Sequence, residues 1–193
     1  MNLYRIFPYD PSAADTDEGG ALYVPPPSPS GRIANVGLYR ELYFAAQPES
    51  AVAEVFGFLL AWYPADFVHA GGRPYAVSSY EFDDASPIFD LNDTAALAKI
   101  GIEQPSHVVT KDRNVSQNWA RTIFSLGVYH GASWWSYYYP DWTVYGLWDF
   151  SSLRHIGSPE ILTPSHPAVI IAARTIVRQT HPRAAMPRRR RRS

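Results

Sequence analysis

The spacing of apolar residues predicts one clear amphipathic helix over residues 48–61. Pro48 suits the first helical position, and Glu49 suits the positive end of the helix dipole. Apolar residues recur at i, i+3, i+4 and i+7, at Val52, Val55, Phe56 and Leu59. Glu54 lies about 200° around the helix from Val52, so it falls outside the main apolar stripe, beside Ala51, Gly57 and Phe58.

Two more helices and one ambiguous segment follow along the chain. Residues 92–100 predict a short helix closed by Gly101. Residues 116–126 predict a second helix that is capped by Ser116 and ended by Gly127. Its expected buried stripe consists of Trp119, Ile123 and Leu126, with Ala120 and Phe124 beside it. Residues 168–178 fit either a helix or a strand.

Short aromatic and β-branched runs predict strands between these helices. The expected strands cover residues 3–7, 41–46 and 74–82, and residues 131–139 and 142–148 form a hairpin around Pro140–Asp141. Residues 23–30 contain four prolines and predict an extended loop. Strands mixed with helices, without strict alternation, indicate an α+β or mixed α/β fold.

Composition narrows the class of protein. With 193 residues and 46% hydrophobic content, the chain can bury one core, and we expect a single domain over residues 1–180. The chain has no cysteine, which excludes disulfides, thiolate nucleophiles, cysteine zinc sites and iron–sulfur clusters.

Charge is distributed unevenly along the chain. Residues 1–182 carry 11 basic and 18 acidic residues, a charge of −7, while six arginines follow Pro182. Such an acidic body argues against a nucleic-acid-binding fold. Residues 181–193 predict a disordered Arg-rich tail, with at most weak nucleic-acid binding. The N-terminus shows no signal-peptide pattern, and no apolar run reaches the roughly 20 residues that span a bilayer, so we expect a cytoplasmic protein without membrane association.

General catalytic motifs do not identify a site. The chain lacks a Gly-rich phosphate loop, an HExxH motif, an EF-hand loop and a Gly-x-Ser-x-Gly elbow. The six histidines show no metal-ligand spacing, and we expect no metal. A Ser-His-Asp triad stays open, because its members come from distant positions.

Three polar residues occur among small or aromatic neighbours, where burial makes an unpaired group costly. Arg32 lies between Gly31 and Gly37, Glu54 lies on the helix over 48–61, and Ser136 lies in an aromatic run. Each also has an ordinary interpretation, as a turn arginine, a solvent-facing helix residue and a polar strand residue. A guanidinium between glycines is suited to phosphate.

In their order and spacing these segments resemble the RES domain, a bacterial toxin family named for Arg, Glu and Ser. The matching stretches are residues 3–6, Gly31–Arg32 through Gly37 to residues 42–45, residues 48–54, residues 113–121, Gly131 with Trp135–Ser136, and residues 146–149. The resemblance covers residues 3–150 and assigns no role to the Pro-rich loop or to the chain after Phe150. The family pattern Gly-Arg-Trp-Asn is changed here, since Ile33 and Ala34 separate Arg32 from Asn35.

The resemblance implies a fold similar to ADP-ribosyltransferases and a toxin that consumes NAD as its substrate, releasing nicotinamide by hydrolysis or phosphorolysis. It implies catalytic roles for Glu54, Arg32 and Ser136, with Glu54 stabilising an oxocarbenium-like state. Arg32 would hold the pyrophosphate, Tyr43 would pack against the nicotinamide or its ribose, and Ser136 and Asn35 would complete the NAD contacts.

Two alternative functions stay open beside the NAD-degrading toxin, and the resemblance also implies a protein partner. The same pocket would serve an ADP-ribosyltransferase that modifies a protein. A different class, a carbohydrate-binding or interaction module, is indicated by the aromatic residues at 134, 135, 137–139 and 142, although strand alternation places half of them in the core. The family also implies an Xre-type antitoxin, which would block the toxin by inserting a segment into the NAD cleft.

Overall fold

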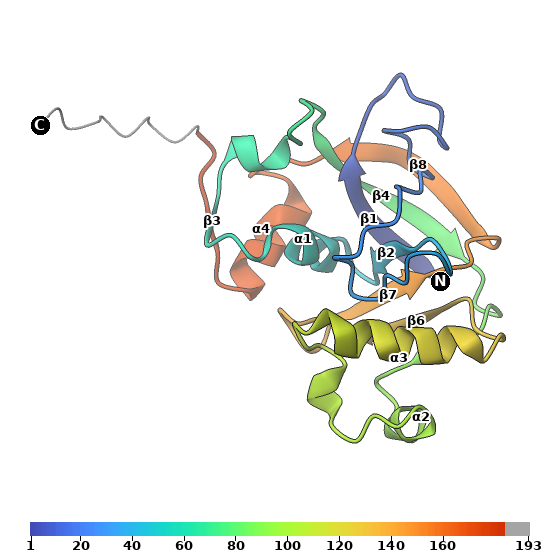
Figure 1. Ribbon diagram of the computed structural model, residues 1–193. Helices are drawn as coiled ribbons and strands as arrows, with labels where there is room; N and C mark the ends of the chain where they lie inside the picture. The colour runs from blue at the N-terminus through green and yellow to red at the C-terminus, as the bar shows by residue number, and fades with distance from the viewer. Residues whose placement is uncertain (184–193) are drawn as a thin grey trace, which may run out of the picture.

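A sheet of seven strands runs through the computed structural model, which describes residues 1–183 (Figure 1). Its strands are β1 (Asn2–Pro8), β2 (Leu42–Ala45), β4 (Tyr75–Phe82), β5 (Ile88–Asp90), β6 (Gly131–Trp135), β7 (Thr143–Leu147) and β8 (Leu153–Ile161). They lie in the order β5-β6-β7-β2-β1-β4-β8. Neighbours are antiparallel, except that β5 and β6 are parallel. The predicted mixed α/β fold is therefore confirmed.

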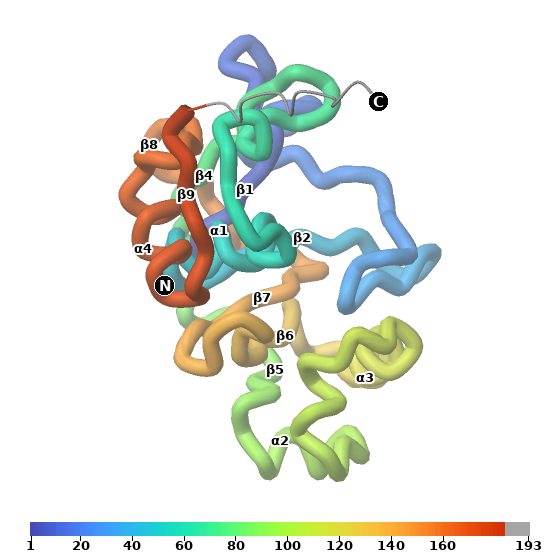
Figure 2. The backbone as a smooth tube through the Cα atoms, turned by 90° about the vertical axis from the view of Figure 1, so that its left-hand side faces the viewer, coloured from blue at the N-terminus to red at the C-terminus, as the bar shows by residue number. Residues whose placement is uncertain are grey.

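Four α-helices and two short 3₁₀ helices accompany the sheet. These are α1 (Pro48–Phe56), α2 (Thr94–Lys99), α3 (Arg113–Ser125), α4 (Pro167–Thr175), η1 (Pro64–Phe67) and η2 (Pro105–His107). The pair α1 and α4 pack together, and α1 also contacts β1 and β2, whereas α3 packs on β6. A second, two-stranded parallel sheet joins β3 (Ala61–Trp62) to β9 (Gln179–Thr180). Figure 2 shows α2 and α3 near β5 and β6, away from α4.

Three clusters of buried side chains divide the core. One joins α2 and α3 to β5, β6 and β7, and a second joins α1 and α4 to the middle of the sheet. The third lies on the opposite face of β1 and β2, where Leu3, Phe7, Leu42 and Phe44 point. Side chains of a strand alternate between faces, so Tyr4 and Tyr43 face the helices instead. The two groups of helices, α2 with α3 and α1 with α4, thus pack on the same face of the sheet, with room for a cleft between them.

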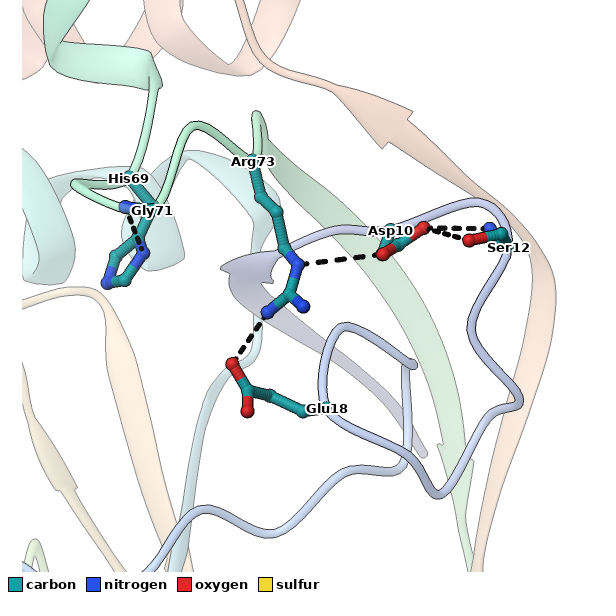
Figure 3. Close-up of polar contacts among 6 residues, drawn as sticks. All are labelled: Asp10, Ser12, Glu18, His69, Gly71 and Arg73. Atoms are coloured by element: carbon teal, nitrogen blue, oxygen red, sulfur yellow. Dashed lines mark hydrogen bonds and ion pairs between the residues drawn. The ribbon is translucent and has the colours of Figure 1, made fainter.

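The loop over residues 9–22 covers the opposite face and is fixed at both ends. Arg73 contacts Glu18, with Nη1 2.6 Å from Oε1, and Asp10, with Nε 3.6 Å from Oδ2 (Figure 3). At the other end, the Ala21 carbonyl accepts hydrogen bonds from the buried guanidinium of Arg5 and from the Tyr80 hydroxyl, at 3.1 and 2.6 Å. The Pro-rich residues 23–30 therefore leave from a fixed point and reach α3 (Figure 2).

Helix α1 is shorter than its apolar spacing predicts, and it ends at Phe56 rather than at residue 61. Its last carbonyls find partners outside the helix, since the Trp62 indole donates to Phe56 O at 2.9 Å. Arg178 donates to Gly57 O through Nε and Nη2, at 3.0 and 2.8 Å. Side chains that bind terminal carbonyls stabilise a helix end. Ala61–Trp62 then forms β3 instead of a last helical turn.

Helix α3 begins earlier than predicted. The cap is Asp112, whose carboxylate accepts from Asn114 N at 2.9 Å, and Ser116 lies fully buried inside the helix. The prediction of Ser116 as the cap is therefore wrong, because an Asp in front of the helix satisfies the free N–H groups first. Trp119 and Ile123 are buried as expected, but Leu126 is half exposed beyond the last turn.

The other predictions are met in part: the strand predicted over residues 131–139 ends at Trp135, and strands β5 and β8 were not predicted. The hairpin of β6 and β7 forms around residues 140–141, and residues 168–178 fall mainly in helix α4. His181 still belongs to the ordered part, since its N–H donates to Trp62 O at 2.8 Å and its ring stacks on Tyr63. The predicted Arg-rich tail lies, from residue 184 onward, outside the described residues. Within residues 1–183 no helix combines the length and apolar character needed to cross a bilayer.

Candidate functional site

A cleft of about 480 Å³ opens on the helical face of the sheet, between α1 and the start of α3. Its walls come from β1, β2, β7, α1, the turn around Arg32 and the Pro-rich loop. The polar residues that line it are Tyr4, Arg5, Ser28, Ser30, Arg32, Glu41, Tyr43, Glu54 and Arg113. A volume of this size, in which polar groups are set among apolar walls, is typical of small-molecule sites.

Glu54 and Ser136 meet at this cleft, although 82 positions separate them in the chain. Helix α1 carries Glu54, and Ser136 directly follows β6. The Ser136 hydroxyl donates to Glu54 Oε1 at 2.6 Å and accepts from Tyr138 N at 3.1 Å. The N–H of Ser136 donates to Trp142 O at 2.7 Å, which fixes the residue across the hairpin. Ser136 therefore holds the carboxylate in one orientation.

Burial controls the electrostatics of Glu54. Burial raises the pKa of Glu54, while the hydrogen bond from Ser136 and the charge of Arg32 act in the opposite direction. The ionised form of this carboxyl group is therefore only weakly screened by water. A fixed charge in such surroundings interacts strongly with a charge that develops beside it. The arrangement is suited to stabilising a cation.

Arg32 is tied to the chain segment that precedes α3. Its Nη1 donates to the carbonyls of Val108 and Thr110, at 3.0 and 2.9 Å. Within the described chain, Nε and Nη2 have no such partner, so they are available to a ligand. Burial lowers the pKa of Arg32, Arg113 adds to this effect, and Glu54 opposes it. Arginine stays protonated in proteins, so the cleft keeps a fixed cation opposite Glu54.

Tyr43 links the turn around Arg32 to the sheet. Its hydroxyl accepts from Ile33 N at 3.1 Å, and burial raises the pKa of Tyr43, so the phenol is neutral. The turn passes close to this hydroxyl at Gly31. A Cβ added there would lie 2.6 Å from Tyr43 Oη and 3.0 Å from Glu41 Oε1. Glycine at this position is what lets the turn approach the sheet.

We expect Gly31→Ala to destabilise the protein by about 1–3 kcal/mol, because the added methyl group overlaps the Tyr43 hydroxyl and must displace the turn. Chemical denaturation measures the change. Gly71→Ala is the control, since an added Cβ there meets only His69 Nδ1 at 3.5 Å, an ordinary contact (Figure 3). Equal stability of the two variants would contradict this account of the turn.

Asn35 does not line the cleft. Its Nδ2 donates to Tyr39 Oη at 2.8 Å and to Gln117 O at 3.0 Å, and its Oδ1 accepts from Arg121 Nε at 3.2 Å. These hydrogen bonds connect the turn around Arg32 to α3 outside the cleft. The structure therefore brings Arg32, Tyr43, Glu54 and Ser136 together, and it places Asn35 among residues that support them.

The lining residues Glu41 and Arg113 received no role in the sequence analysis. Glu41 is nine-tenths buried although it is charged, and Arg113 is the exposed first residue of α3. The signal for Glu41 was present, since it lies two positions before Tyr43 and so shares its face of the strand. Arg113 lies inside a matched stretch, but nothing in its neighbourhood suggested a role.

Other kinds of site find less support. Among residues 1–183, no group of three or more His, Asp or Glu side chains could hold a metal ion. Trp134 and Trp142 are buried in the core, and of the neighbouring tyrosines Tyr137 and Tyr139 are exposed. A stacking surface for sugars would thus consist of these two tyrosines rather than of the tryptophans.

Comparison with family models identifies one family for this chain. The family model described as RES domain matches residues 2–165. Among solved structures, a chain of the crystal structure of the M. tuberculosis MbcT-MbcA toxin-antitoxin complex is similar, with a TM-score of 0.58 and 14% sequence identity. The match covers 90% of this chain and 89% of that one, and at this identity it shows a shared fold. No curated protein matches the chain.

Proposed function

The chain belongs to the RES domain family, and on this premise we propose that it is a toxin that degrades NAD by breaking the bond between nicotinamide and ribose. The observation that carries the proposal is the half-buried carboxylate of Glu54, which Ser136 holds by a hydrogen bond and whose pKa the charge of Arg32 affects, in one cleft. The family model confirms the family assignment from the sequence, and its match extends past Phe150 to residue 165. The resemblance to ADP-ribosyltransferases stays a prediction.

Cleavage of the bond between nicotinamide and ribose requires a negative charge beside the ribose, and it does not require a general acid that protonates the leaving group. When the N-glycosidic bond breaks, its electron pair moves to the positively charged nicotinamide ring, which leaves as a neutral molecule without protonation. The positive charge that remains develops on the ribose, where Glu54 would stabilise it. An oxygen of water or phosphate then supplies the electron pair of the new bond at the anomeric carbon, and water loses a proton.

The other residues would position the substrate. Arg32 would bind the pyrophosphate through Nε and Nη2 while Nη1 stays on Val108 and Thr110. Tyr43 would pack against the nicotinamide or its ribose, because its ring lies on the cleft wall. Ser136 would act through Glu54, whose carboxylate it orients. Binding of this kind lowers the barrier by fixing the reacting groups.

Purified protein incubated with NAD tests the proposal, with nicotinamide release followed in the presence and absence of phosphate. Phosphate dependence separates phosphorolysis from hydrolysis. NAD that stays intact under both conditions, with folded protein, would show that degradation is not the activity. NAD labelled in its ADP-ribose part and incubated with cell lysate identifies the alternative, since label on a protein band indicates ADP-ribosyl transfer.

We also propose that an antitoxin protein binds this chain. The supporting observation is the shared fold with a chain of a toxin-antitoxin complex. The open cleft offers the place for a blocking segment, as in other peptide–groove complexes. Co-purification of the protein expressed from its native operon tests the partner, and recovery of the toxin alone from cells that tolerate its expression would count against it. The Xre type of this partner stays a prediction.

Ser136→Ala is expected to lower kcat/KM for NAD by about tenfold and to move the loss of activity at low pH to higher pH. The catalytic carboxylate must be ionised, so activity falls as the pH decreases through the pKa of Glu54. The Ser136 hydrogen bond lowers that pKa, and its removal leaves burial less opposed. The pH dependence of kcat/KM measures the shift.

Ser86→Ala is the matched control for Ser136→Ala, since Ser86 bonds Ser152 away from the cleft. We expect wild-type kinetics for this variant. An acid limb at the same pH in Ser136→Ala and in the wild type would mean that the hydroxyl does not act through Glu54.

A further inference from the structure

We propose that Glu41 binds the ribose hydroxyl groups of the dinucleotide and thereby selects NAD over NADP. This inference rests on the proposed function, and it adds the specificity of the same cleft. Glu41 lies just before β2 and lines the cleft. It is outside the group of residues that the family resemblance assigns.

The first observation is a buried carboxylate without a protein partner. Glu41 is 9% exposed, and its Oε2 is covered yet has no hydrogen-bond partner among the described residues. Burial raises the pKa of Glu41, and only its own backbone N–H acts against this. Buried polar groups are almost always hydrogen-bonded, because an unpaired one loses its hydration without compensation. Hydroxyl donors of a bound ligand would supply the missing bonds.

The second observation is the position of Glu41 along the cleft. Its Oε1 and the Tyr43 hydroxyl both lie against Gly31, 3.0 and 2.6 Å from the place of an added Cβ. Glu54 lies instead beside Ser136 and affects the pKa of Arg32. The two carboxylates therefore have different neighbours along the same cleft. A dinucleotide with one ribose at Glu54 would extend past the turn toward Glu41 with the other.

The third observation is the charge around Glu41. Glu41 affects the pKa of Tyr39 and of Tyr43, but neither Arg32 nor Arg113 shifts the pKa of Glu41. A 2′-hydroxyl offers this carboxylate a donor, as acidic residues do for ribose in dinucleotide folds. The 2′-phosphate of NADP offers this carboxylate only acceptors and a negative charge. The environment therefore favours the unphosphorylated ribose.

Nicotinamide release from NAD and from NADP tests the inference in the wild type, Glu41→Gln and Glu103→Gln. We expect the wild type to use NAD with a kcat/KM at least about 10-fold above that for NADP. In Glu41→Gln, the value for NAD should fall by about 10-fold, mainly through KM, while that for NADP does not fall. Glu103→Gln removes an exposed charge and should match the wild type.

A wild type that uses both dinucleotides equally, or an unchanged NAD to NADP ratio in Glu41→Gln, would overturn the inference. A purely structural role of Glu41 would lower both activities together and leave the ratio unchanged. Circular dichroism verifies folding, and if Glu41→Gln does not fold, Glu41→Asp replaces it, because the shorter side chain withdraws from the ligand and should also lower the ratio.

The two proposals can fail separately. A wild type that releases nicotinamide from neither dinucleotide would refute the degradation of NAD. Calorimetric titration of wild type and Glu41→Gln with NAD and NADP then decides the inference. A preference for NAD that is lost in Glu41→Gln would support it, and the absence of a preference, or of any binding, would refute it.

Discussion

Glu54→Gln is expected to slow NAD cleavage by about 100- to 1000-fold without disturbing the fold. The amide has the size of the carboxylate and can still accept the 2.6 Å hydrogen bond from Ser136, so the cleft keeps its shape. What the variant lacks is the negative charge that would face the developing cation of the ribose. The effect should appear in kcat rather than in KM, because the charge matters most in the transition state.

Purified enzyme and living cells both provide the measurement. Nicotinamide release gives kcat directly, and brief induction of the two proteins in cells, with NAD and growth followed together, gives the consequence. Rapid loss of NAD and growth arrest are expected with the wild type alone. Growth arrest with normal NAD would point to protein modification, and equal activity of Glu54→Gln would remove Glu54 from the mechanism.

The same substitution should make the protein more stable at neutral pH. The pKa of Glu54 is raised in the folded state, so the protonated form is favoured there and ionisation costs stability as the pH rises through this pKa. Glutamine never ionises and avoids that cost. The difference in melting temperature should disappear below the ordinary glutamate pKa of about 4.3, where the wild type is protonated in both states. A less stable variant at pH 7 would contradict the role of burial.

Local signals in the sequence predicted helices α1, α2 and α3 and strands β1, β2, β4, β6 and β7, but not strands β5 and β8. The start of α1 at Pro48, the hairpin around residues 140–141 and the end of α2 before Gly101 all follow from residues within a few positions. The end of α1 does not, because the guanidinium that binds Gly57 O belongs to Arg178, 121 residues away. Spacing alone extends the helix to residue 61, since nothing local indicates this contact.

The site shows the same limit. Order and spacing identified Arg32, Tyr43, Glu54 and Ser136, which the structure brings to one cleft or directly behind it. The contact between Glu54 and Ser136 depends on how α1 packs against the end of β6, which no local pattern contains. Asn35 was grouped with the NAD contacts because of its place near Arg32. Its side chain instead points to α3, where Nδ2 donates to Gln117 O at 3.0 Å.

Arg32→Lys should lower kcat/KM for NAD by about 100-fold, which makes it the second largest effect we expect. The Nη1 atom of Arg32 donates to Val108 O and Thr110 O, while Nε and Nη2 have no hydrogen-bond partner among residues 1–183. A lysine has one ammonium group and no planar fork, so it satisfies either the carbonyls or the pyrophosphate. Because lysine keeps the positive charge, the loss of kcat/KM measures the contribution of the guanidinium's geometry and not that of its charge.

A control variant and a binding titration show whether Arg32 binds the substrate or only supports the turn. Arg154→Lys is the matched control, because Arg154 forms an exposed ion pair with Glu81 on the far edge of the sheet, and surface pairs contribute little. Titration with ADP-ribose, which contains the pyrophosphate but no nicotinamide, should show weaker binding to Arg32→Lys than to Arg154→Lys. Reduced thermal stability with unchanged ADP-ribose affinity would instead assign Arg32 to the turn. The pyrophosphate would then need another partner, for which we expect the exposed Arg113, a cation that lines the same cleft.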